Sequence, residues 1–146
     1  MAFVTRVDFS KPPDSFVNYS TYLGGLHGDV AYDITADPAG IIYVTGYTLS
    51  GDFPRTPDAV VGTWGGGTDA FLAKLDPAKP GTAGLVYSSF VGATGTHVGY
   101  GLAAAADGTV YVGGLTTIQD ILVSDNASQL NYGGGLSDGF LIVVGQ

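Results

Sequence analysis

The chain contains no cysteine, which excludes disulfides, thiolate metal sites and a cysteine nucleophile. Glutamate is missing as well, because all 13 acidic residues are aspartate. Aspartate is common in turns and forms helices poorly, whereas glutamate is a good helix former. The choice of acid therefore argues for a chain of strands and turns.

Basic residues are scarce: there are five lysines and arginines, and the formal net charge is −8. A surface this poor in positive charge cannot follow a phosphate backbone, so we expect no nucleic-acid partner. No apolar run approaches the roughly 18 residues that a membrane-spanning helix needs, so we expect no membrane span. Residues 1–7 read as a strand and show no signal-peptide pattern.

The abundant residues favour a β-protein with tight turns. The chain has 24 glycines, nine tyrosines and seven phenylalanines, and 45% of its residues are hydrophobic. Aromatic residues favour strands, and glycine allows sharp turns between them. The hydrophobic content is high enough for a folded core.

An internal repeat decides the organisation. Residues 2–69 reappear as 70–138, and a third copy begins at 139 and continues to 146. Matching positions include Phe3/Phe71/Phe140, Tyr19/Tyr87, Tyr43/Tyr111, Gly46/Gly114 and the glycine triplets 65–67/133–135. A repeat of this length is typical of a unit that buries its apolar face only by stacking on copies of itself. We therefore expect 1–146 to form a single repeat domain.

Each copy predicts four strands, because runs of apolar alternation are separated by glycine, proline and aspartate clusters. The expected strands are 3–7, 16–23, 29–36, 41–48, 71–75, 84–91, 98–106, 109–116 and 140–144. Long connections cover 49–69 and 117–138. Four-stranded antiparallel meanders repeated at this period predict an all-β fold of β-propeller-like blades, about two per chain.

The phase of the repeat leaves both ends of this unit open. The first strand is a third strand of a blade, and the sequence stops after the third strand of another. Because exposed strand edges tend to pair, we predict strand exchange between chains, with 16–23 of one chain finishing the last blade of its neighbour. The alternative is a piece excised from a longer propeller. The expected assembly residues are Phe3, Val7, Phe16, Tyr19, Tyr22, Phe140, Leu141, Ile142, Val143 and Val144.

Five segments carry a distinctive pattern: YSTYLGG at 19–25, VAYDI at 30–34, IYVTGYT at 42–48, DFP at 52–54 and GGGTDAFLAKLD at 65–76. In these segments the chain resembles the bacterial SBBP-type β-propeller repeat family. The second copy departs from the pattern, with FVGA at 90–93 and DIL at 120–122. The resemblance implies an exported bacterial module, extracellular or at the cell surface, and it brings no established catalytic residues.

Aspartates at turns raise the possibility of calcium, since oxygen-rich loops suit a hard cation. The candidates are Asp37, Asp69, Asp107 and Asp138. No spacing resembles an EF-hand, and turn capping explains aspartate at these places without a metal, so we expect no cofactor. The histidines, His27 and His97, have no second histidine or cysteine at ligand spacing. We expect both in loops.

A sugar platform is a second possibility. Trp64 precedes a glycine triplet and Asp69, and Tyr132 occupies the equivalent place in the second copy. An aromatic face beside a carboxylate suits glycan stacking, although both aromatic rings would equally serve to pack the long connection on its blade. We expect no enzyme activity, because the chain has no Gly-x-Ser-x-Gly elbow and no phosphate-binding loop.

The sequence thus predicts a non-catalytic, self-associating structural module, serving as a scaffold, surface layer or filament subunit. Its expected partners are other copies of itself. The alternative is a carbohydrate-binding oligomeric propeller with glycan partners, and the third reading is a fragment of a larger secreted propeller.

Overall fold

The computed structural model describes residues 1–145, which fold as three antiparallel β-sheets without an α-helix. The first sheet pairs β1 (Ala2–Val7) with β2 (Val17–Leu23). The middle sheet has the order β3 (Asp29–Ala36), β4 (Ile42–Thr48), β5 (Asp69–Leu75) and β6 (Leu85–Val91). The last sheet has the order β7 (His97–Ala104), β8 (Val110–Thr116) and β9 (Asp138–Val144).

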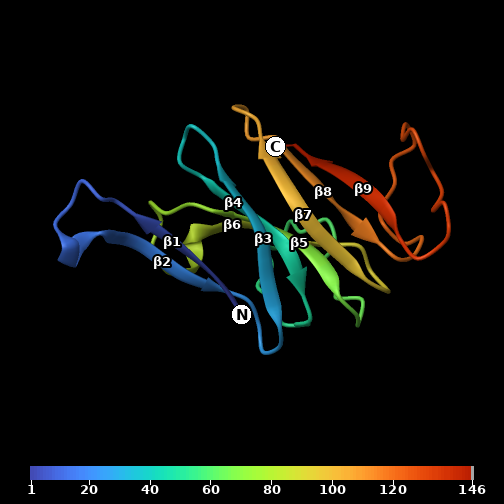
Figure 1. Ribbon diagram of the computed structural model, residues 1–146, viewed down its shortest axis with the longest axis horizontal. Helices are drawn as coiled ribbons and strands as arrows, with labels where there is room; N and C mark the ends of the chain where they lie inside the picture. Colours follow the sequence, from blue (N-terminus) through green and yellow to red (C-terminus); the bar gives the residue numbers. More distant parts are fainter. Residues whose placement is uncertain (146) are drawn as a thin grey trace.

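The three sheets follow one another along the long axis of the molecule, so the middle sheet has a neighbouring sheet on each face (Figure 1). One hydrophobic cluster joins Val4 and Leu23 of the first sheet to Val44, Phe71 and Phe90 of the middle sheet. The second cluster lies between the middle and last sheets. It contains Tyr43, Leu72, Val110 and Val112. Burying apolar faces between stacked sheets is the main stabilising force of this architecture.

The sheets are meanders, because strands that follow one another in the chain are also neighbours in each sheet. A short turn joins the first two strands of the middle and last sheets. In the middle sheet, residues 37–41 form the turn between β3 and β4, where the Gly40 N–H donates to the Asp37 carbonyl at 2.9 Å. Gly40 has a φ of +87°, a backbone conformation that favours glycine. The equivalent Gly108 has a φ of +84°, so the second copy repeats the turn.

The innermost strands of two sheets, β3 and β7, lie side by side. The rings of Tyr32 and Tyr100 are 5.2 Å apart between them. Asp33 also accepts a hydrogen bond from the Leu102 N–H at 2.7 Å. Both strands shift register near these residues, at 31–33 and at 99–101, which bends the inner edge of each sheet.

Two 3₁₀ turns, Pro13–Ser15 and Gly81–Gly84, precede β2 and β6, which are the fourth strands of the repeat pattern. The first residues of the two turns are 68 positions apart in the sequence, so the turns belong to the repeat. Prolines at 12, 13 and 80 explain why the chain cannot continue a strand there. Among residues 1–145, no helix is long and apolar enough to cross a membrane.

The strands expected from the sequence are confirmed to within about two residues at each end. The all-β fold is confirmed too, as is the order of strands within each meander. One expectation was wrong: His97 is not in a loop but begins β7, with none of its surface exposed. Gln146, the last residue of the expected third copy, lies outside the described residues.

Candidate functional site

The outward face of the first sheet carries large apolar side chains that are interior elsewhere in the same chain. Phe3 is 69% exposed and Tyr22 is 79% exposed. Their equivalents in the middle sheet, Phe71 and Phe90, are 0% and 1% exposed. The middle pair is covered by Val4 and Leu23 of the preceding sheet, whereas no described sheet precedes the first one.

The outward face of the last sheet also carries exposed apolar side chains, but it corresponds to the other side of the middle sheet. Leu141 is 70% exposed and Tyr111 is 42% exposed, while their equivalents Leu72 and Tyr43 are 1% and 2% exposed. Those two buried residues face the last sheet, within the second cluster. The last sheet therefore presents the side that would cover a following sheet.

The two open faces are complementary, because the chain already joins such faces twice. Val4 of the first sheet shares a cluster with Phe71 of the next, and Leu72 shares a cluster with Phe140 of the sheet after that. Val4, Leu72 and Leu141 occupy equivalent positions. The exposed Leu141 thus lacks the Phe71-like partner that its two equivalents have.

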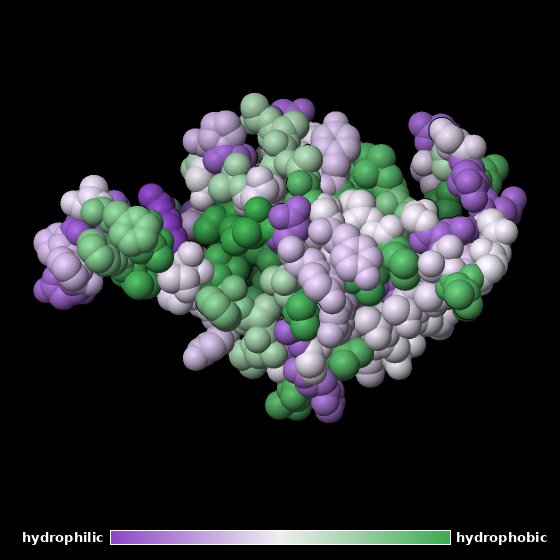
Figure 2. Space-filling view, in the orientation of Figure 1, coloured by the Kyte–Doolittle hydropathy of each residue, from purple (hydrophilic) through white to green (hydrophobic). Residues whose placement is uncertain are grey.

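The middle sheet is also incompletely covered at its inner end. Ile34 in β3 is 54% exposed, whereas Leu102, its equivalent in β7, packs on the second cluster. The difference arises because, in the part of the chain that the structure describes, the first sheet contains only β1 and β2, and no strand equivalent to β7 or β8 covers β3. Figure 2 shows the resulting hydrophobic surface beside the β1–β2 hairpin.

A groove of about 440 Å³ runs along the free side of β9, between this strand and β6. Its walls include Ile142 and Val144 of β9, Tyr87 and Phe90 of β6, and Ser124 of the connection 117–137. In the middle sheet, the corresponding position beside β5 is filled by β6. Relative to β9, the groove therefore occupies the position that β6 has relative to β5 in the middle sheet.

The long connection 49–68 shows how a fourth strand is held in a complete sheet. The Thr56 N–H donates to the Ser88 carbonyl at 3.2 Å, and the Ser88 N–H donates to the Thr56 hydroxyl at 2.9 Å. Farther along, the Phe90 N–H donates to the Val61 carbonyl at 3.3 Å. Ser124, the equivalent of Thr56, lies at the open groove and bonds Asn126 at 2.8 Å.

The structure divides the predicted assembly residues between outward and inward positions. Leu141 and Val143 are outward, and Phe3, Val7 and Tyr22 are exposed on the first sheet. The inward side chains on the last strand, Phe140, Ile142 and Val144, are partly buried. Phe16 packs edge-on against Phe9 at 5.4 Å, and Tyr19 borders the first cluster. Burial, and to a lesser extent Asp76, raises the pKa of the Tyr19 phenol.

A buried polar cluster lies at one end of the middle and last sheets. Asp69 and His97 are both 0% exposed. The His97 Nε2 lies 2.6 Å from the Thr94 carbonyl and 2.9 Å from the Asp120 carboxylate. Burial raises the pKa of Asp69, against the hydrogen bond from Gly65 and the nearby His97, which act to lower it. This cluster could not be predicted from the sequence, because its residues are far apart in the chain.

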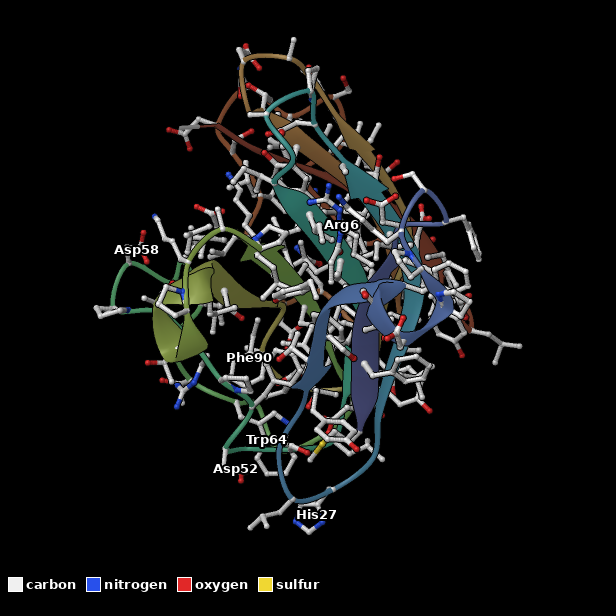
Figure 3. The ribbon with its side chains drawn as sticks, turned by 90° about the vertical axis from the view of Figure 1, so that its left-hand side faces the viewer. Arg6, His27, Asp52, Asp58, Trp64 and Phe90 are labelled. Carbon is white, nitrogen blue, oxygen red and sulfur yellow. The ribbon has the colours of Figure 1, made fainter. Side chains whose placement is uncertain are left out.

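The equivalent end of the first copy is built with other residues. Asp29, the equivalent of His97, is 4% exposed and accepts hydrogen bonds from Thr48 at 2.5 Å and from the Gly25 N–H at 3.0 Å. Asp52, the equivalent of Asp120, accepts one from the Leu26 N–H at 3.0 Å. Both clusters thus pin the loop that enters an innermost strand. In Figure 3, the exposed His27 marks this end of the molecule.

The four calcium candidates all accept hydrogen bonds from nearby backbone N–H groups. Asp37 accepts from Ile41 at 3.0 Å, Asp69 from Gly65 at 2.8 Å, Asp107 from Thr109 at 2.9 Å, and Asp138 from Gly133. The bond to Thr109 lowers the pKa of Asp107. Within residues 1–145, no group of three or more acidic or histidine side chains could hold a metal ion.

The predicted sugar-platform residues lie in packed surroundings. Trp64 packs on the first cluster, and its indole Nε1 is buried with no hydrogen-bond partner in the described residues. A Cβ at position 51 would lie 2.9 Å from the indole ring of Trp64, so the glycine there leaves room for the ring. Figure 3 places Trp64 near Asp52, at the loop end of the sheets. Tyr132 is partly buried, and its hydroxyl donates to the Gly135 carbonyl at 3.1 Å.

Comparison with protein families agrees with this geometry. Residues 18–54 match the family model SBBP, described as a beta-propeller repeat. The matched segment spans β2, β3 and β4, so it crosses from the last strand of one sheet into the next. Searches of curated proteins and of solved structures found no match to the chain. The chain is therefore an all-β protein whose residues 18–54 match the SBBP model of a β-propeller repeat.

Proposed function

We propose that this protein is a non-catalytic structural module that associates with further copies of itself through its open ends. The single observation that carries the proposal is the equivalence between Leu72, 1% exposed inside the chain, and Leu141, 70% exposed at its end. A copy that supplied the next sheet would bury Leu141 as Leu72 is buried. The association would add blades to a propeller-like stack.

Such contacts are head to tail, because the outward face of the last sheet differs from that of the first. A heterologous contact closes into a ring when the rotation between copies fits, and otherwise continues as a filament. The exposure of Phe3 and Tyr22 on the first sheet and of Leu141 on the last supports association, since exposed apolar side chains on a sheet face commonly mark an interface. We propose an extracellular or cell-surface setting, in line with the SBBP repeat.

The mass of the purified chain in solution tests the proposal. Light scattering coupled to gel filtration is expected to give a multiple of 14.9 kDa across a range of concentrations. Leu141→Asp should return the protein to a monomer, because a charge at this face would have to be buried in the contact. Leu136→Asp is the matched control, because Leu136 is 94% exposed in the connection 117–137 and does not line the groove beside β9. A stable, soluble wild-type monomer would contradict the proposal.

A further inference from the structure

We propose that the groove beside β9 is a docking site for β2 of a second copy, with β9 taking the place of that copy's own β1. This inference rests on the proposed self-association and specifies its partner segment. The two strands that compete for β2 are equivalent in the repeat: Phe3 and Val7 of β1 correspond to Phe140 and Val144 of β9. Exchange of an equivalent strand costs little, because the hydrogen bonds lost within one chain are regained between chains.

The pairing follows from the complete middle sheet, which serves as the template. There β5 pairs β6 with Phe71 opposite Phe90 and Ala73 opposite Ser88. β9 is equivalent to β5, and β2 is equivalent to β6. The same register would therefore place Phe140 opposite Tyr22 of the second copy, and Ile142 opposite its Ser20. Within one chain, Tyr22 and Ser20 instead lie opposite Phe3 and Thr5.

The groove has the features that a fourth strand needs. It is lined by apolar side chains of β6 and β9 on both sides, and β9 has no strand on this edge among residues 1–145. Ser124 is exposed at its rim, in the position from which Thr56 binds both the N–H and the carbonyl of Ser88. In the exchanged pair, Ser124 would bind the backbone of Ser20 in the same way.

The exchange also explains which apolar residues are exposed. Tyr22, 79% exposed, would enter the groove at the place that Phe90 occupies in the middle sheet. The middle sheet of the second copy would then follow, setting its Ile34 against β7 and β8 in the manner of Leu102. Leu141 would replace Val4 in covering that sheet. β9 is the better strand for this role, because Val143 stands where β1 has Arg6.

Engineered disulfides test the docking directly, since the chain has no cysteine of its own. Ser20→Cys and Ile142→Cys are made in separate chains, mixed, unfolded and refolded together, and then oxidised. A covalent dimer is expected on a non-reducing gel, because the template places the two positions directly opposite each other. Ser20→Cys mixed with Leu141→Cys is the register control. Leu141 points to the other face, so this mixture should give a yield of dimer at least tenfold lower.

A second variant tests whether β1 must leave β2 before β2 can dock on another copy. In Thr5→Cys with Ser20→Cys, the two thiols replace hydroxyls that lie 3.0 Å apart, and a disulfide there locks β1 onto β2. When oxidised before association, this variant should remain a monomer of 14.9 kDa, and reduction should restore the wild-type mass. Circular dichroism of both forms verifies that the variant is folded.

The outcomes separate this inference from the proposed function. If the wild type is monomeric, both are overturned. If the wild type associates but the locked variant associates equally and the Ser20/Ile142 pair gives no covalent dimer, the docking of β2 is overturned while self-association stands. A covalent dimer from the in-register pair alone, together with a monomeric locked variant, supports the inference.

Discussion

Phe3 and Phe71 occupy the same position of the repeat, yet Phe3 is 69% exposed and Phe71 is completely buried. The difference comes from the neighbouring sheet and not from the strand itself, because the two strands have equivalent partners: β1 pairs with β2, and β5 pairs with β6. The repeat therefore supplies matched pairs of residues, one buried and one exposed. Substituting both members of a pair tests how much burial contributes to stability.

Leu72 and Leu141 form the first such pair. Leu72→Ala should lower the free energy of unfolding by about 2 to 5 kcal/mol, because it leaves a cavity in the second cluster. Leu141→Ala should lower it by less than about 0.5 kcal/mol when unfolding is measured at concentrations where the chain is monomeric. Urea denaturation at low micromolar concentration measures both values. Equal losses for the two variants would mean that Leu141 is buried in the monomer.

Tyr43 makes the stability of the fold sensitive to alkaline pH. Burial and the 2.8 Å hydrogen bond to Asp37 raise the pKa of its phenol from 10.0 to about 12. Because the folded state holds this proton more tightly than the unfolded state, the stabilisation is complete below pH 10 and is lost as the pH rises toward 12. We expect the loss to amount to about 2 to 3 kcal/mol.

Tyr43→Phe should flatten this alkaline decline, as followed by urea denaturation at several pH values between 9 and 12. Tyr111→Phe is the matched control, because Tyr111 is 42% exposed and alanine stands at position 105, where the first copy has Asp37. If both variants kept the decline of the wild type, another group would be responsible for it. The same carboxylate is affected in turn: desolvation acts to raise the pKa of Asp37, but the bonds from Tyr43 and Ile41 lower it overall.

Asp69 should have the opposite effect to an ordinary stabilising carboxylate. Burial raises its pKa above 3.8, so ionising it favours the unfolded state, and its contribution to stability falls as the pH rises through its folded pKa. Relative to the wild type, Asp69→Asn should therefore gain stability as the pH rises from 3.8 toward neutral pH. Thermal melts of both proteins across this range measure the difference. A difference independent of pH would contradict the expectation.

Gly65 is a site of close backbone contact. A Cβ there would overlap the carbonyl of Ala93, which belongs to the loop before β7. Gly65→Ala should therefore destabilise the fold by about 1 to 3 kcal/mol through displaced backbone. Gly62→Ala is the control, because no atom lies within 4 Å of its added Cβ. Chemical denaturation of both variants tests the prediction, and equal stability would show that the loop yields without cost.

The strands and their order could be predicted from the sequence because both depend on local signals. Apolar alternation places β4 and β8, and the glycines at 40 and 108 mark the turns before them. The repeat then transfers every boundary from one copy to the other. The position of His97 could not be predicted this way, since its equivalent is an aspartate, and its burial depends on Asp120 and Thr94 of other segments.

By itself, the sequence determined the all-β fold, the internal repeat and the order of the strands. These follow from periodicity, which is a property of neighbouring residues. Only the tertiary structure decided which side of each end sheet is open and where the groove beside β9 lies. The reason is physical: burial of a side chain such as Leu141 depends on whether another sheet lies opposite it, and no local pattern records that.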